Sequence, residues 1–153
     1  MRRLAVCVAV AGLAWAATAA AVAATIVPQR GIGGVTLGMT EPQVRQSQGE
    51  PIRLKNGRNE FGRYRILRYP TFQVTFQGLD KVTAVQTTSP KQRTVAGIGV
   101  GSRKAQVKAK VPGVVCEPGH CHLGKFLPGR RVTDFFLGRT GLVTRVVVGF
   151  VID

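Results

Sequence analysis

One short phrase occurs twice in the chain, and this duplication constrains the fold more than any other sequence feature. "GVTLGMTEPQV" at 34–44 aligns with "GIGVGSRKAQV" at 97–107. The residues that match are Gly, Val and Gln, which perform neither acid–base nor nucleophilic chemistry. The repetition therefore predicts a structural unit used twice rather than two active sites.

Each copy of the phrase carries the signals of a helix start. Thr40 is a good N-cap, and Gln43 three residues later completes a capping box. Gly49 and then Pro51 end this first helix near residue 48. In the second copy we expect Ser102 to be the N-cap. Both helices are short and poor in apolar residues, so they depend on packing against another element.

The segments after each helix alternate with a period of two, which is typical of β-strands. Phe72, Val74 and Phe76 fall on one face of a strand, while the polar residues between them fall on the other. The run 146–152 is apolar on both faces, which predicts a central strand. Strands are expected in "RYRILRYP", "TFQVTFQ", "KVTAVQTT", "VVCEPGHCHLGKFL", "RRVTDFFL" and "LVTRVVVGFVID".

These patterns predict an α+β fold of two tandem repeats, each a short helix followed by an antiparallel β-meander, packed as a helix-covered sheet. The expected boundaries are a signal peptide at 1–24, a lead-in at 25–33, the first repeat at 34–90 and the second at 91–153. The two repeats together have the length of one compact domain.

The first 24 residues have the pattern of a secretory signal. A basic "MRR" precedes an uncharged Ala-rich run that ends in small residues, so cleavage is expected after Ala23 or Ala24. The alternative, an uncleaved membrane anchor, is disfavoured because the run is only weakly hydrophobic. We expect a secreted or periplasmic protein with no integral membrane segment after cleavage.

The order G-M-T-x-x-Q-V, a short helix, G-x-P and a meander resembles the small helix-plus-sheet modules of the outer-membrane assembly lipoprotein family SmpA/OmlA. The duplication resembles the architecture of the β-lactamase inhibitory protein. This resemblance implies a non-catalytic module that binds proteins, in the duplicated case through a saddle of sheets. The chain departs from the pattern at Ser47, Gln48, Lys110 and Val111, and it lacks a lipobox. No contact residues carry over from either family.

The segment "CEPGHCH" invites a metal site, but a disulfide is the stronger prediction. Pro118 and Gly119 suit a type II turn, which sets Cys116 opposite Cys121 across a hairpin in an oxidising compartment. His120 and His122 then point to the other face, so one ion cannot collect all four side chains. We therefore predict a disulfide, no metal site and no cofactor.

The residues expected for catalysis are scattered. The seven carboxylates have plain structural roles, and Asp134, which is unusual inside a strand, is expected to pair with an arginine. The serines are in no nucleophile-elbow context. "GIGVGS" lacks the Lys-Ser/Thr ending of a phosphate-binding loop. The sequence predicts a protein that is not an enzyme.

Basic and aromatic side chains supply the candidate partner-binding surface. The chain has 22 Lys and Arg against 7 Asp and Glu, a formal net charge of +15. Arg and Tyr are favoured at protein interfaces, and alternation places Arg63, Arg65, Leu67 and Tyr69 on one face. A solvated basic face is an equally good interpretation, and nucleic acid is not an expected ligand for an exported protein. The candidates are Arg63, Tyr64, Arg65, Arg68, Tyr69, Arg130 and Arg131.

Three functions follow from these features. The first is a secreted protein-binding module for a partner with an acidic surface, of which an inhibitor of an extracytoplasmic protein is one kind. The second is an envelope-associated structural protein that binds anionic polymers or lipid head groups through its basic surface. The third and weakest is an enzyme or metal carrier based on His120 and His122.

Overall fold

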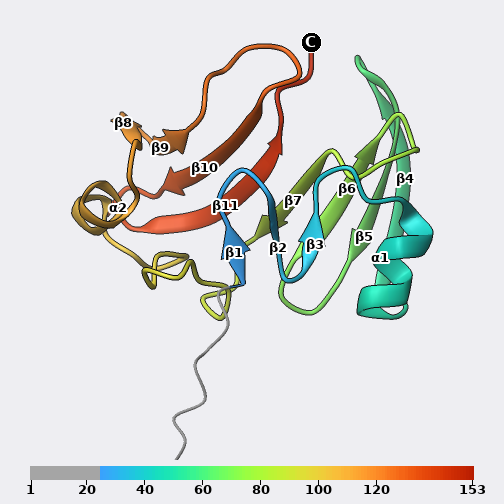
Figure 1. Cartoon of the computed structure of the whole chain (residues 1–153), viewed down its shortest axis with the longest axis horizontal. Helices are drawn as coiled ribbons and strands as arrows, with labels where there is room; N and C mark the ends of the chain where they lie inside the picture. Colours follow the sequence, from blue (N-terminus) through green and yellow to red (C-terminus); the bar gives the residue numbers. More distant parts are fainter. Residues whose placement is uncertain (1–24) are drawn as a thin grey trace, which may run out of the picture.

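The computed structural model describes residues 25–153, and the predicted signal peptide lies outside the described residues (Figure 1). Thirteen elements follow one another along this part of the chain. They are β1 (Ile26–Val27), β2 (Gly31–Ile32), β3 (Val35–Thr36), α1 (Glu41–Gln48), β4 (Arg53–Asn59), β5 (Gly62–Arg68), β6 (Gln73–Gln77), β7 (Ala84–Thr87), α2 (Lys104–Lys110), β8 (Val115–Glu117), β9 (His120–Leu123), β10 (Arg131–Leu137) and β11 (Val143–Phe150).

Eight of the strands form one antiparallel sheet. Its order is β4-β5-β6-β7-β11-β10-β9-β8, and the three short strands β1, β2 and β3 form a second sheet. β11 lies in the middle of the large sheet, between β7 and β10, which confirms the central strand predicted from the apolar run at 146–152. The two halves of the sheet are therefore joined through backbone hydrogen bonds between β7 and β11.

The predicted fold class is wrong. We expected an α+β fold of two tandem repeats, but residues 25–153 are mostly β, with 44% of them in strands and 12% in helices. This part of the chain does not contain two helix-then-meander repeats: one large antiparallel sheet and one small sheet account for its strands.

The short helices explain why a helix-covered sheet does not form. α1 has eight residues and buries only Val44, and α2 has seven and buries only Val107. The middle of the large sheet is covered instead by the small sheet, whose strand β2 contacts β7 and β11 (Figure 1). Ile26 and Ile32 from the predicted lead-in are fully buried in this layer. The small sheet thus supplies the second apolar layer that shields the wide face of the large sheet from water.

The two copies of the duplicated phrase adopt similar local structures. The backbone amide of Thr40 donates to Gln43 Oε1 at 2.9 Å, and the amide of Arg103 donates to Gln106 Oε1 at 2.8 Å. The predicted N-cap Ser102 is wrong, because Arg103 occupies that position. The Ser102 hydroxyl is buried and accepts the amide of Gly99. The hydroxyl is thus used to close the loop before the helix.

Neither helix of residues 25–153 combines the length and apolar character needed to cross a membrane.

Candidate binding face of the sheet

The large sheet has one face toward the core and one face that we call the open face. Cross-strand partners share a face, and one row of partners crosses all eight strands. We call it the transverse row. It consists of Arg53, Arg68, Gln73, Gln86, Val147, Asp134, His122 and Val115.

The adjacent row points to the core. Leu67, Val74, Val85 and Val148 are each fully buried, and they pair across β5, β6, β7 and β11. The residues of the transverse row in the same strands remain exposed or half-buried. The open face is thus the polar side of the alternation, and it carries the candidate binding groups.

Strand β5 does not present the predicted set of Arg63, Arg65, Leu67 and Tyr69 to the open face. Leu67 and Tyr69, which share a face with Arg63 and Arg65, are buried. The open face receives Tyr64, Ile66 and Arg68 instead. The ambiguity in the sequence comes from Ile66 and Leu67, since either can define the apolar side of the strand. Only packing against the core selects Leu67.

Arg65 is held by helix α1. Its Nη1 lies 2.6 Å from Glu41 Oε2, and its Nε donates to Asn56 Oδ1 at 2.9 Å. Arg45, one turn along α1, donates to the other oxygen of Glu41 at 2.8 Å and also pairs with Glu50. Burial raises the pKa of Glu41, but the hydrogen bonds from Arg65 and Arg45 outweigh it and leave the pKa below its ordinary value. Arg65 therefore fastens α1 to the sheet.

Tyr69 also has a structural role. Its ring stacks on Phe72 at 5.3 Å between centroids, and its hydroxyl donates to the carbonyl of Gly49 at 3.1 Å. Burial raises the pKa of this hydroxyl. Gly49 has a φ of 78° at the end of α1, so the hydrogen bond ties Tyr69 to the helix C-cap. Tyr69 reaches the surface only through the edge of a pocket.

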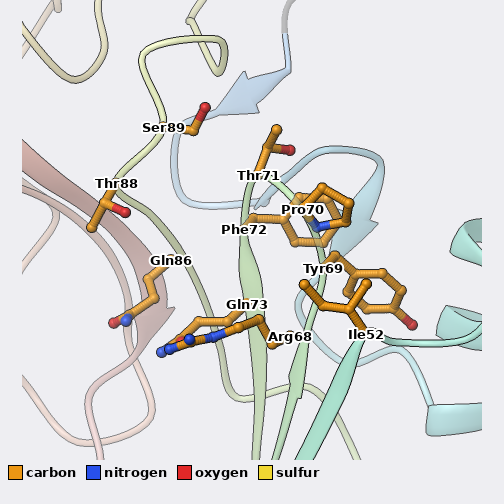
Figure 2. A pocket seen from close by; sticks show the side chains of 10 residues that line it. All are labelled: Ile52, Arg68, Tyr69, Pro70, Thr71, Phe72, Gln73, Gln86, Thr88 and Ser89. Atoms are coloured by element: carbon orange, nitrogen blue, oxygen red, sulfur yellow. The ribbon is translucent and has the colours of Figure 1, made fainter.

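A shallow recess lies where β5, β6 and β7 meet on the open face. It has a volume of about 310 Å³. Figure 2 shows the polar ends of Arg68, Gln73 and Gln86 on one side of the recess, with apolar side chains such as Ile52 and Pro70 on the other. The full lining is Ile52, Arg68, Tyr69, Pro70, Thr71, Phe72, Gln73, Gln86, Thr88 and Ser89.

A second recess of about 370 Å³ adjoins the first one. It is lined by Arg53, Lys55, Ile66, Arg68 and Gln73, and so shares Arg68 and Gln73 with its neighbour. Together they combine cationic groups with apolar side chains, and Ile52 is 67% exposed beside them. We call this pair the arginine recess. Of the residues that line the arginine recess, only Arg68 and Tyr69 were predicted from the sequence. The alternation of polar residues in β4 and β6 could have indicated the others.

Arg130 and Arg131 lie in a separate place. They line a recess of about 710 Å³ with Gln29, Lys125 and Phe150, together with two glycines, and it shares no lining residue with the arginine recess. The Arg131 guanidinium lies 5.6 Å from the centre of the Phe150 ring. Of the predicted basic residues, Arg68 therefore lies in one recess and Arg130 and Arg131 in another, whereas Arg63 and Arg65 line neither.

The predicted pairing of the cysteines is confirmed. Cys116 and Cys121 are cross-strand partners in the β8–β9 hairpin, with their sulfurs 1.96 Å apart. Gly119 has a φ of 86°, as the third position of a type II turn requires. Cys121 is buried in the core, whereas His120 and His122 lie on the open face, as the alternation predicted.

Asp134 lies beside His122 without the arginine partner expected for it. It is 9% exposed, and its Oδ1 is buried with no hydrogen-bond partner among the described residues. Burial raises the pKa of Asp134, while His120, His122 and Arg145 act to lower it. Arg145 stacks on Phe136 at 4.0 Å from the ring centre. The predicted ion pair is thus not found in residues 25–153.

Comparison with models of protein families finds no match, and comparison with curated proteins finds none either. Among solved structures, the chain aligns with a DUF4309 family protein (YjgB) from Bacillus subtilis at 14% identity and a TM-score of 0.42. The alignment covers 85% of this chain and 90% of that chain. So distant a likeness carries no argument about function, and the resemblances to SmpA/OmlA and to the β-lactamase inhibitory protein stay predictions.

Proposed function

We propose that this chain is a non-catalytic, extracytoplasmic protein-binding module whose arginine recess takes an acidic segment of a partner protein. The geometry of the recess supports this function best. Arg53, Lys55 and Arg68 supply positive charge, and Ile52 and Ile66 supply apolar contact. Interfaces that combine Arg with a desolvated apolar contact concentrate binding energy in a few residues.

The single observation that carries the proposal is the position of Arg68. It belongs to both parts of the recess and is exposed, and it lies opposite Arg53 and Gln73 on the two neighbouring strands. A guanidinium in this position can bind a carboxylate through two parallel hydrogen bonds. The excess of basic over acidic side chains in the whole chain steers such a partner toward the surface.

Strands β4 and β5 provide a matched pair of variants to test this role. Arg53 and Arg68 are cross-strand partners on the open face, whereas Arg58 and Arg63 are cross-strand partners whose side chains point to the opposite face. R53A/R68A and R58A/R63A therefore remove equal charge from the same two strands. The two pairs lie on opposite faces of the sheet, with Arg58 and Arg63 next to the β4–β5 turn and Arg53 and Arg68 at the far end of the hairpin.

The partner is captured with the wild-type protein from the extracytoplasmic fraction, purified, and then titrated against each variant by calorimetry. We expect R53A/R68A to bind at least about tenfold more weakly, and R58A/R63A to bind within about twofold of the wild type. Equal losses in the two variants would contradict a recess-specific interface. Full affinity in R53A/R68A would contradict it as well.

The second candidate function is binding of anionic envelope polymers or lipid head groups. The separate basic recess at Arg130, Arg131 and Lys125 favours this alternative. Binding of this kind depends on the number of charges and weakens steeply as salt rises. Equal losses in the two arginine variants, together with loss of binding above physiological salt, would support it over a protein interface.

A further inference from the structure

A cluster of metal-binding side chains lies at the other end of the open face, in the β8–β9 hairpin. Glu117, His120 and His122 each offer a ligand atom, and these atoms all lie within 4.8 Å of one another. His120 and Glu117 are cross-strand partners on either side of the turn, and His122 follows His120 on the same face. One exposed carboxylate and two half-buried imidazoles therefore face the same small volume.

The spacing of these groups suits a divalent transition metal. His120 Nε2 lies 3.5 Å from Glu117 Oε2, and the two imidazole centroids are 5.6 Å apart. Ligands held about 2.0–2.2 Å from a tetrahedral zinc ion lie roughly 3.3 Å from one another. The Glu117–His120 pair is close to this separation, and the ligand atom of His122 lies within 4.8 Å of both.

The backbone orients one of the imidazoles. His122 Nδ1 lies 3.3 Å from the carbonyl oxygen of Gly124. A carbonyl oxygen only accepts hydrogen bonds, so in the neutral ring this contact favours the tautomer with the proton on Nδ1 and the lone pair on Nε2. Metal-binding histidines commonly have this arrangement, in which a second hydrogen bond fixes the tautomer and the direction of the ring.

Asp134 provides an independent observation that points to a cation. It lies directly across from His122 on β10, is more than nine-tenths buried, and keeps an oxygen without a hydrogen-bond partner. A buried carboxylate without partners is costly to the fold unless a positive charge lies beside it. A metal ion held by His122 and its neighbours supplies that charge.

The backbone around the cluster is restrained, and an aromatic side chain shields part of the cluster from solvent. The Cys116–Cys121 disulfide joins β8 and β9 on the opposite face of the hairpin, and it restrains the neighbouring cross-strand pair of Glu117 and His120. The Phe126 ring lies 4.7 Å from that of His122 and 6.4 Å from that of His120. A restrained hairpin with an apolar wall strengthens the interaction of its polar groups with an ion.

We propose that Glu117, His120 and His122 are the protein ligands of a zinc-binding site on the open face, with Asp134 as the buried carboxylate that balances the charge of the ion. Two imidazole nitrogens and a carboxylate oxygen form a donor set that zinc favours, and one coordination position remains for water or for a group of a partner. The site is separate from the arginine recess and does not depend on the function proposed for it.

The chain contains only two histidines, and both lie in this site. Titration of the untagged protein with zinc chloride, followed by calorimetry, is therefore a direct test. We expect one equivalent of zinc per chain. H120Q and H122Q should each weaken binding by more than about tenfold, because each removes a ligand.

The two carboxylates are tested against Glu60, an exposed carboxylate in the β4–β5 turn. We expect E117Q to weaken zinc binding about tenfold and D134N about three- to tenfold, whereas E60Q should leave it unchanged. The imidazole proton signals in NMR provide a second readout, since both should shift with one equivalent of zinc. D134N should remain folded, because Asn has nearly the same shape as Asp.

Three results would overturn the proposal. They are the absence of zinc binding at millimolar concentration, binding that persists unchanged in the H120Q/H122Q variant, and equal effects of E60Q and E117Q. Weaker zinc binding in D134N without any loss of folded structure would identify Asp134 as a charge partner of the ion.

Discussion

The two ends of the transverse row lie on the same face of one sheet but differ in how far their charged side chains are exposed to solvent. At the β4–β5 end, Arg53 on the edge strand and Arg68 on the next strand are both exposed to solvent. At the β8–β10 end, His122 is half-buried against the Phe126 ring, and Asp134 beside it is buried. Water and salt screen solvated charges, so these interact weakly, whereas desolvated charges are screened much less and interact strongly.

This comparison indicates that burial of the charged groups, more than their residue type, decides what each end can bind. Exposed guanidinium groups select partners by their overall sign of charge and by the contacts made around them. The buried carboxylate of Asp134 is destabilising when left alone, and in our proposal a bound zinc ion offsets this cost. The predictions below test this comparison, beginning with the largest expected effect.

Removal of the core beneath the histidine end should produce the largest loss of stability. Phe135 is fully buried and lies opposite Cys121 and Val146, whereas Phe61, at the β4–β5 turn, is 43% exposed. We expect F135A to lower the free energy of unfolding by about 3–5 kcal/mol, and F61A by less than about 1 kcal/mol. Urea unfolding measures both, and similar losses would show that the two ends have equal cover.

Removal of the disulfide should loosen the histidine end selectively. The small loop that it closes predicts a loss of about 2 kcal/mol in C116S/C121S. Hydrogen exchange should accelerate in β8 and β9 while β4 and β5 remain as in the wild type. Alkylation of the untreated protein without reductant should find neither Cys116 nor Cys121 free. Two alkylated cysteines would contradict the disulfide.

Replacement of Asp134 by Asn should increase stability in the absence of zinc. The change removes a buried charge that has no partner, so we expect a gain of about 1 kcal/mol at neutral pH, seen as a higher Tm. R68Q, at the solvated end of the row, should change stability by less than about 0.5 kcal/mol. A loss of stability in D134N would mean that Asp134 forms an ion pair with Arg145 in solution.

Loss of the ion pairs between α1 and β5 should have the smallest effect. Arg65 is partly exposed, so E41Q is expected to cost only about 0.5–1 kcal/mol at pH 7. Because the pKa of Glu41 is lower in the folded protein than its ordinary value of 4.5, its contribution is present above that pH and is lost as the pH falls through the folded value.

Urea unfolding at pH 7 and at pH 3 measures this contribution. The difference between wild type and E41Q should shrink at the lower pH. A difference that stays constant with pH would show that Glu41 acts through packing rather than charge.

Several features of the fold were predictable because their causes are local. Thr40, Gln43 and Gly49 set the limits of α1, as the capping signals predicted. The position of Pro118 and Gly119 predicted the hairpin that brings Cys116 to Cys121. Turn and cap preferences depend on a few neighbouring residues, so they can be recognised from the sequence.

The fold class and the candidate sites depended on contacts between distant segments. The lead-in at 25–33 forms strands that cover the middle of the large sheet, because this face is too wide for two short helices to bury. The choice of Leu67 over Ile66 for the core decided that Arg68, rather than Arg65, faces outward. Strand alternation offers two faces, and only packing selects between them.

Local sequence patterns were enough to predict strands β5 to β11, the ends of α1, the cysteine pair and the excess of positive charge, since each follows from residues close together or from simple counts. The tertiary structure decided which charges are solvated and which are buried. It set Asp134 beside His122, on neighbouring strands, and removed it from water. The chemistry of a side chain depends on its surroundings, and these form only when the strands assemble into one sheet.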